Sequence, residues 1–324
     1  MKKKILIYNS GGGIGDSVQL LPLILSLNSS IDSSEIYYLG AHDFHFNGKL
    51  KEYKIKIKHL DIGIQYFGFR WWHLIKARKM FSSLGIKKFD LIIDLQSKIR
   101  NTLILKTLPA DNFYSTTYNF LFCSKRTNYT FENDLTQNTL NNIGKILNIE
   151  IKKKDYDINQ IDKIYFTEAE RLLPKNNYIG FSITQGNIYR KKTWPLINFI
   201  NLAKILIKKN KIPVFFIEKN YVQIIEQIKK EVPLALFPEQ NTKYACPALV
   251  TAMATRLEKS ISIDNGIMHI LSLVNKPMIV LFGPTNSEKF APKNNLVKIL
   301  DSKKMYNTKD ITKITINDVS KYFL

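Results

Sequence analysis

The strongest constraint on the fold is a series of short, almost wholly apolar segments, each followed by turn residues and a helix-like pattern. The first covers residues 4–8 and runs into four glycines within residues 11–15. Near-continuous apolar strands are typical of parallel sheets that helices cover on both faces. We therefore expect an α/β fold built from strand–turn–helix units. The other segments of this kind are residues 35–40, 89–95, 178–182, 213–217, 260–264 and 277–282.

These segments fall into two series, which a Lys-rich stretch with little apolar pattern separates between about residues 150 and 177. We expect a linker in this stretch. The pattern predicts two Rossmann-like domains that face one another across a cleft, with ligands at the carboxyl ends of the strands. The predicted domains are residues 1–160 and 161–324.

The composition leaves several partners open. The 324 residues carry 48 Lys and Arg against 27 Asp and Glu, a formal net charge of +21. Such a charge fits a nucleic-acid binder, a protein at an anionic membrane or one that handles phosphorylated substrates, and it also fits simple compositional drift. Only two cysteines occur, Cys123 and Cys246, which excludes a disulfide framework and a Cys-based zinc site. With neither a signal-peptide pattern nor a stretch of ~20 apolar residues, we expect a cytoplasmic protein.

The first glycine turn is neither a dinucleotide fingerprint nor a P-loop. Asp16 stands where the third glycine of G-x-G-x-x-G would fall, and no Gly-Lys-Ser/Thr follows. Two interpretations remain open for Asp16. It fits a carboxylate that stabilises the first turn of a helix, and it fits a group at a cleft edge that accepts a proton from a substrate hydroxyl.

Two later strand ends also carry polar groups. Residues 184–195 combine a hydroxyl, a glycine and adjacent cations before a Trp-Pro pair, which suits a diphosphate, with a solvated basic loop as the alternative. Asp264 and His269 converge at the end of the strand at 260–264, although a lone His is more often structural. Residues 69–79 mix aromatics with cations, as in a membrane-surface site, an anionic-ligand site or a single-strand binder, or as in a plain amphipathic helix.

Taken in order, five segments resemble the family 9 glycosyltransferases, the lipopolysaccharide heptosyltransferases, over about residues 4–292. Each segment is weak alone, but five in the same order are specific. They are Gly15-Asp16 with Leu21-Pro22, Phe89-Asp90 with Asp94-Leu95-Gln96, Lys192-Thr193-Trp194-Pro195, Asp264-Asn265-Gly266 with His269, and Phe282-Gly283-Pro284-Thr285.

The resemblance implies a GT-B architecture, in which residues 1–160 bind the acceptor and residues 161–324 bind the nucleotide sugar. In this architecture the last helix can pack back on the N-terminal domain. It implies an inverting, metal-independent glycosyltransferase with no cofactor besides its nucleoside-diphosphate sugar donor. The family default is heptose from ADP-heptose, moved to a lipopolysaccharide-core or related glycan. The implied partners are this donor, a glycolipid or glycan acceptor and an anionic membrane, at the inner face of the cytoplasmic membrane, and not nucleic acid.

The resemblance also implies roles for residues. Asp16 matches the family's base, and Lys192 matches the group that contacts the donor diphosphate, whose developing charge the helix amides near Gly266 would also meet. The remaining donor-binding candidates are Thr184, Gln185, Gly186, Glu218, Asp264, Asn265, Gly266 and His269. The acceptor-binding candidates are Gly13, Gly15, Arg70, Trp72, Lys76, Gln96 and Arg100, and no residue is assigned to a metal.

The chain departs from the family pattern near the donor. Asn265 stands where Thr is usual, residues 184–187 replace a Pro-Gly-Ala-Ser-like run, and Ser97 follows Gln96 where glycine is common. These changes leave open a sugar-nucleotide-binding protein that has lost catalysis. A nucleic-acid-binding protein is a further alternative, although the chain lacks the aromatic-basic RNA motif.

Overall fold

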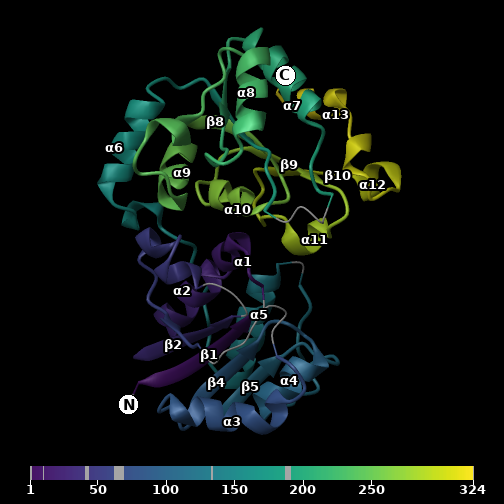
Figure 1. Ribbon diagram of the computed structural model, residues 1–324. Coiled ribbons are helices and arrows are strands. Elements are labelled where there is room, and N and C mark those ends of the chain that lie inside the picture. Colours follow the sequence, from purple (N-terminus) through teal and green to yellow (C-terminus); the bar gives the residue numbers. More distant parts are fainter. Residues whose placement is uncertain are drawn as a thin grey trace. The chain divides into compact units, whose positions relative to one another are not determined.

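The structure is a computed structural model that describes residues 2–9, 11–40, 44–61, 69–132, 134–186 and 191–323. The chain divides into two compact units, Met1–Tyr156 and Asp157–Leu324. The sequence placed the boundary after residue 160, four residues further on (160 − 156 = 4). Each unit is a parallel five-stranded sheet covered by helices (Figure 1), so the α/β fold predicted from the apolar segments is confirmed.

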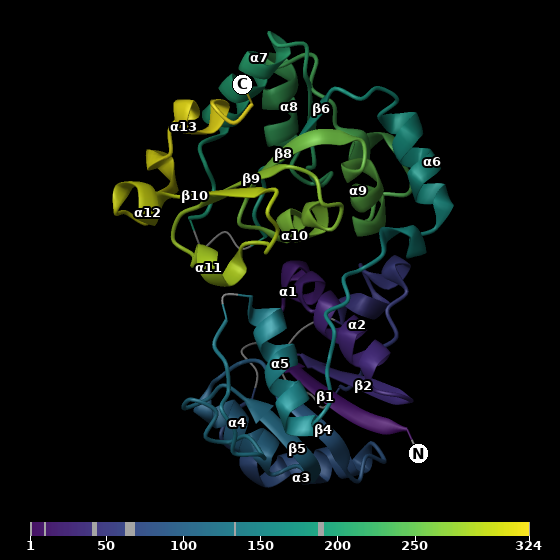
Figure 2. The ribbon, with the colours of Figure 1, turned by 180° about the vertical axis from the view of Figure 1, so that it is seen from behind.

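The first unit has the strand order β3-β2-β1-β4-β5. Because β1 pairs in parallel with both β2 and β4, Ile5 lies opposite Ile36 on one side and Leu91 on the other. Helices α2 and α5 contact each other, as do α3 and α4, and Figures 1 and 2 show the two pairs on opposite faces of the sheet. The elements are β1 (Lys3–Asn9), α1 (Ile14–Gln19), α2 (Leu21–Ser30), β2 (Ser34–Gly40), β3 (Lys58–His59), α3 (His73–Ser83), β4 (Phe89–Asp94), α4 (Ile99–Lys106), β5 (Ala110–Ser115) and α5 (Leu135–Leu147), with 3-10 turns at His45–Asn47 and Lys51–Tyr53.

The second unit has the order β10-β9-β8-β6-β7, also fully parallel. Leu236 adds a single parallel bridge to Val214 of β7. The elements are α6 (Lys163–Leu172), β6 (Tyr178–Ser182), α7 (Leu196–Ile207), β7 (Ile212–Phe215), α8 (Val222–Glu231), α9 (Pro247–Ala254), β8 (Leu257–Ile263), α10 (Gly266–Ser272), β9 (Met278–Phe282), α11 (Ser287–Phe290), β10 (Val297–Asp301), α12 (Ser302–Tyr306) and α13 (Ile316–Ser320), with 3-10 turns at Ile158–Gln160, Pro238–Asn241 and Ile311–Lys313.

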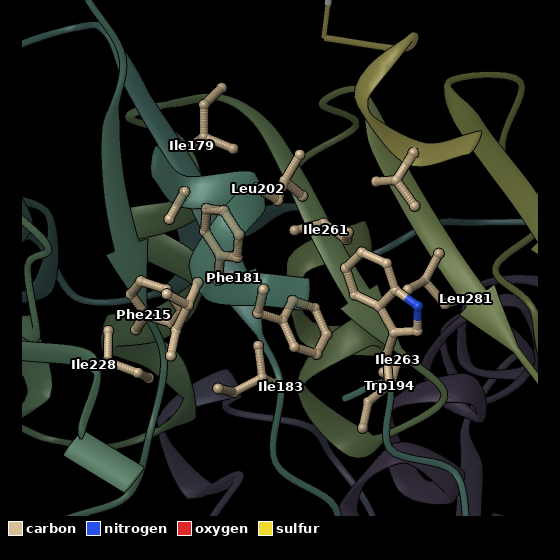
Figure 3. Close-up of a cluster of buried hydrophobic side chains, with 14 of the residues drawn as sticks. Ile179, Phe181, Ile183, Trp194, Leu202, Phe215, Ile228, Ile261, Ile263 and Leu281 are labelled. Carbon is tan, nitrogen blue, oxygen red and sulfur yellow. The ribbon is translucent and has the colours of Figure 1, made fainter. Parts of the chain in front are cut away.

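The core of the second unit explains why its strands are so apolar. Side chains of β6, β7, β8 and β9 interleave with those of α7, as Figure 3 shows around Phe181, Ile261 and Leu281. Trp194, which precedes α7, is 1% exposed and packs edge to face on Phe199, with 4.9 Å between the ring centroids. Burial of an aromatic side chain of this size removes 150–250 Å² from water, so Trp194 fixes the start of α7 firmly.

Two local expectations need correction. The helical pattern after the first glycine turn is two helices, because the chain breaks at Leu20 and Pro22 opens the first turn of α2. The expected linker contains α6, which packs on α9. Within the second unit, α13 contacts α7 and places Val319 in the core.

No helix of the described residues combines the length and the apolarity needed to cross a bilayer.

Candidate functional site

Most of the candidate residues lie near the point where the strand order reverses in their sheet. In the first unit β2 lies on one side of β1 and β4 lies on the other, so the strand order reverses between β1 and β4. In the second unit the same reversal lies between β6 and β8. Such reversals open a crevice at the carboxyl ends of the strands, where open α/β sheets bind ligands. Each unit therefore carries one such set of candidate residues, which we call its half-site.

In the first half-site, Asp16 lies in the third position of α1 and its Oδ2 accepts a hydrogen bond from the Gly13 amide at 3.1 Å. The glycines around it are needed for close approach. A Cβ at Gly11 would lie 2.7 Å from Asp16 Cγ, and one at Gly13 would lie 3.3 Å from Asp16 Oδ2. The helix-stabilising role expected of Asp16 is therefore present, and the loop holds the half-buried carboxylate at the end of the sheet where the strands finish.

A hydrogen-bonded row ties the neighbouring strand ends together. Asn9 Oδ1 accepts from the Gly11 amide at 3.0 Å and from Gln96 Nε2 at 2.5 Å. The backbone amide of Gln96 donates to Asp94 Oδ1 at 3.0 Å. Asp94 is fully buried, and this burial raises its pKa despite hydrogen bonds from Thr102 and from backbone amides. The row fixes Gln96 beside the loop that carries Asp16.

Two residues that the sequence did not single out also reach this edge. His45 Nε2 lies 3.2 Å from the Gly12 carbonyl. Tyr38, in β2, donates to the Asn9 carbonyl at 3.4 Å, and its burial and the Asp16 charge both raise its pKa. A usable sequence signal was the polar residue that ends the first strand, Asn9, since each strand end of a parallel sheet meets its neighbours.

The structure brings only some of the acceptor candidates together. Gly13, Gly15 and Gln96 lie at the edge that carries Asp16. Arg70, Trp72 and Lys76 instead lie on α3 or just before it. Within the described residues, no hydrogen bond or ion pair joins those three to the Asp16 loop. The remaining candidate, Arg100, lies in the first turn of α4.

In the second half-site, Lys192 and Asp264 form an ion pair. Lys192 Nζ lies 2.5 Å from Asp264 Oδ2, and the two side chains are 16% and 9% exposed. The Lys192 amide also donates to Gln185 Oε1 at 3.1 Å, which joins the two sides of residues 187–190. Asn187 and Arg190, which belong to the sequence motif, lie outside the described residues. The pair fixes a cation at the reversal of the second sheet.

Asn265 replaces the usual Thr and acts as a clamp between strand ends. Its Nδ2 donates to Ser182 Oγ and to the Thr184 carbonyl, both at 2.8 Å. Its Oδ1 accepts from the Met268 amide at 2.8 Å and caps α10. A Thr hydroxyl has no second donor for this bridge. Asn265 therefore has a structural role at this position, and the Met268 amide that it caps already has a hydrogen-bond partner.

His269 is buried on α10, at 5% exposure. Burial lowers its pKa to about 4, although the Asp264 carboxylate favours the charged form. The imidazole is therefore neutral near pH 7, and Lys192 is the cation of this cluster. The expected contribution of the α10 amides is weak, because the helix has only seven residues.

A second carboxylate accompanies Glu218, which is exposed after β7. Glu239 lies in the 3-10 turn at Pro238–Asn241, and its neighbour Gln240 donates to the Ile217 carbonyl at 2.9 Å. Burial and the Glu218 charge raise the pKa of Glu239 to about 7. No sequence motif marks Glu239, so only the fold reveals it.

The remaining donor candidates flank the ion pair. Thr184 and Gln185 follow β6. The Thr184 carbonyl accepts from Asn265 Nδ2, and the Gln185 carbonyl accepts from the Tyr221 hydroxyl at 3.3 Å. Gly186 is exposed, and a Cβ there would meet nothing within 4 Å. Trp194 holds this segment in place by donating its Nε1–H to the Ile314 carbonyl at 2.7 Å. Among the described residues, no group of three or more His, Cys, Asp or Glu side chains could hold a metal ion.

The chain is similar to known proteins along most of its length. The profile of Glycosyltransferase family 9 (heptosyltransferase) matches residues 77–319. Lipopolysaccharide heptosyltransferase 1 of Campylobacter coli is 24% identical over 335 aligned positions, which cover 97% of this chain and 93% of that protein.

Two solved structures share the fold. The family 9 glycosyl transferase of Veillonella parvula has a TM-score of 0.68 at 18% identity, and the comparison covers 99% of this chain and 96% of that one. The E. coli heptosyltransferase WaaC with ADP-2-deoxy-2-fluoro heptose has a TM-score of 0.66 at 14% identity, covering 99% and 98%.

Proposed function

The chain belongs to glycosyltransferase family 9, and from that premise we propose that it moves a sugar from a nucleoside-diphosphate donor to a lipopolysaccharide-core or related glycan. Heptose from ADP-heptose is the family default for the donor. The observation that carries the proposal is the Lys192–Asp264 ion pair at the strand reversal of the second sheet. It supplies a fixed cation where a ligand of such a sheet binds.

We assign the donor to the second unit. Lys192 has three N–H donors, so its ammonium group contacts a diphosphate while Asp264 keeps it in position. Glu218 and Glu239 offer carboxyl groups to the nucleoside end of the donor. Because the burial that raises the pKa of Glu239 leaves this group partly protonated near neutrality, it can both donate and accept hydrogen bonds there.

The proposed reaction is an in-line displacement at the anomeric carbon with inversion. The acceptor hydroxyl gives its proton to the Asp16 carboxylate while its oxygen bonds to the anomeric carbon. The bond from that carbon to the phosphate oxygen breaks at the same time, and the nucleoside diphosphate leaves with the electron pair. Lys192 stabilises the negative charge that grows on the leaving group. We propose that this stabilisation needs no metal ion and no further cofactor.

We assign the acceptor to the first unit, where Gly13, Gly15 and Gln96 surround Asp16. The acceptor would be a phosphorylated or acidic glycolipid at the inner face of the cytoplasmic membrane. This location is proposed because the chain carries a net charge of +21, which suits both an anionic donor and an anionic acceptor.

The decisive test is Asp16→Asn, measured as the rate of nucleoside-diphosphate release with acceptor present. Loss of a general base lowers kcat by about 10²–10⁴-fold. The matched control is Asp318→Asn, because Asp318 holds the same third helix position in α13 and accepts from the Thr315 amide at 2.8 Å. A kcat for Asp16→Asn within a fewfold of the wild type would contradict the assignment of the base.

The donor is identified by thermal shift with ADP-, UDP-, GDP- and CDP-sugars, with and without EDTA. One nucleotide should raise the Tm in the wild type and in Asp16→Asn, but not in Lys192→Ala. Turnover that disappears in EDTA and returns with a divalent ion would refute the metal-independent mechanism.

A further inference from the structure

The helix α3 turns apolar side chains toward solvent. Trp71 and Trp72, just before the helix, are 53% and 61% exposed, and Ile75 is 89% exposed. Large aromatic residues at such exposure are unusual on a surface that meets only water. Trp71 and Ile75 are not among the candidate site residues, whereas Trp72 is an acceptor candidate from the sequence.

The local structure keeps these side chains outside. Phe69 is buried and stacks on Tyr8 at 5.1 Å between ring centroids. His73 is also buried, and its Nδ1 accepts from the Arg70 amide at 2.8 Å. With both ends of this turn anchored in the core, the two tryptophans between them cannot fold inward without breaking it.

The outward face of α3 combines apolar and cationic groups. Ala77 faces the core, and Ile75 lies about 160° around the helix from it. Trp72 is three residues before Ile75 and Lys79 is four residues after it, so all three share the outward face. Exposed Lys76 and Arg78 flank this face on either side. An apolar centre with cations along its edges is typical of a helix that lies in a bilayer interface.

The charge around this face has one sign. Residues 70–88 contain no Asp or Glu. Within the described chain, only one of their cations has an ion-pair partner, Lys88 with Asp111. The exposed Val222 of α8 differs, because the same helix carries Glu226 and Glu231. The six cations of the segment are Arg70, Lys76, Arg78, Lys79, Lys87 and Lys88.

We propose that residues 70–79 dock on the surface of an anionic phospholipid bilayer, with Trp71, Trp72 and Ile75 at the acyl boundary and the cations at the headgroups. Arg70, Trp72 and Lys76, expected from the sequence to bind the acceptor, are then assigned to contacts with lipid. The proposal stands on this surface alone and does not depend on the proposed reaction.

The tryptophans of the chain provide a direct readout. Of the three, Trp194 is buried at 1% exposure, whereas Trp71 and Trp72 are exposed. Phosphatidylcholine vesicles that contain phosphatidylglycerol should therefore shift the emission to the blue and protect it from iodide, through Trp71 and Trp72. Vesicles of phosphatidylcholine alone should do neither, and added salt should reverse the effect, since screening weakens headgroup attraction.

Variants separate the two contributions in a vesicle co-sedimentation assay. Trp72→Ser with Ile75→Ser should weaken partitioning by about tenfold or more, and Lys76→Ala with Lys79→Ala by about tenfold. The matched controls are Ile197→Ser, at 53% exposure on α7, and Lys208→Ala with Lys209→Ala at the end of the same helix. These controls should partition like the wild type.

Each alternative occupant gives a different result. Equal binding to neutral vesicles, no binding, or unchanged binding of the α3 variants would overturn the proposal. A blue shift with a soluble core glycan and no vesicles would assign the face to the acceptor instead. A concentration-dependent mass that Trp72→Ser abolishes would assign it to a second copy of the chain.

The proposed function is tested separately with Ile75→Ser alone, since Ile75 is not among the acceptor candidates. This variant should keep the thermal shift with the nucleotide sugar and the kcat on a water-soluble acceptor. If the wild type itself shows neither the thermal shift nor turnover, the proposed reaction is refuted, whereas the vesicle result still stands.

Discussion

The two half-sites occupy the same place in their sheets, but their principal side chains are fixed over different distances along the chain. Asp16 is held by the amide of Gly13, three residues away, in a loop of glycines. Lys192 is held by Asp264, 72 residues away, and Asn265 reaches 83 residues back to Ser182. The local site can lose its carboxylate with little effect on folding, whereas the long-range site joins the strand ends of its own unit. Substitutions in the second unit should therefore change stability and activity together, and those around Asp16 mainly activity.

The largest effect is expected for Trp194→Ala. Truncating a fully buried Trp costs about 3–5 kcal/mol of unfolding free energy, because it leaves a cavity, and the Ile314 carbonyl also loses its donor. The measurement is urea denaturation followed by circular dichroism. Trp72→Ala is the control, since an exposed side chain should change the free energy by less than about 0.5 kcal/mol. Similar losses for the two would mean that Trp194 does not anchor the second core.

Next in size is Asp264→Leu, which leaves the Lys192 ammonium without its partner. Removal of one member of a largely buried pair costs about 3 kcal/mol. The double variant Asp264→Leu with Lys192→Met should recover part of that loss, because no uncompensated charge remains, although donor binding should stay absent. Additive losses in a double-mutant cycle would show that the pair is not coupled.

A pH effect of about 1–3 kcal/mol is expected from Glu239, whose pKa is raised to about 7 in the folded protein. The folded state then binds this proton more tightly than the unfolded state does. The stability that this group contributes is thus fully present below its ordinary value of 4.5 and is lost as the pH rises through 7. Glu239→Gln should be more stable than the wild type above pH 7, with the gain shrinking as the pH falls toward 4.5. Denaturation midpoints across that range test this, and a constant difference would contradict it.

His269 gives the opposite slope within the same unit. Burial lowers its pKa to about 4 in the folded protein, so the unfolded state binds the proton more tightly. Its contribution is present above its ordinary value of 6.5 and is lost as the pH falls toward 4. His269→Gln should remove this loss on acidification, and an unchanged acid limb would contradict the assignment. Because the imidazole is already neutral near pH 7, His269→Gln should change stability little there.

The smallest stability effect is expected in the first half-site. In Gly11→Ala the new methyl group would lie 2.7 Å from Asp16 Cγ, so the carboxylate must move. We expect kcat to fall by about tenfold or more, with less than about 1 kcal/mol lost in unfolding free energy. Gly186→Ala is the matched control for unfolding free energy, because its added Cβ meets nothing within 4 Å. If Gly11→Ala kept full activity, the position of Asp16 would not matter for the reaction.

Much of the fold could be predicted because apolar strands leave a clear pattern. The strand expected at 178–182 coincides with β6, and that at 89–95 exceeds β4 by one residue. The break at Leu20 and helix α6 were missed. Leu20 lies inside an apolar run, so the helical pattern continues across the break. Helix α6 has only one fully buried residue, Ala169, and its apolar periodicity is therefore weak.

The sequence alone determined the class of fold, the family and the positions of Asp16 and Lys192, because these follow from local patterns of apolar residues, glycines and charges. Only the tertiary structure decided which partners those residues have. It paired Lys192 with Asp264, made Asn265 a clamp, placed Glu239 beside Glu218 and put Trp72 and Lys76 at the start of α3. The physical reason is that burial, hydrogen bonding and pKa depend on distances across the sheet, which residues far apart in the chain share only after folding.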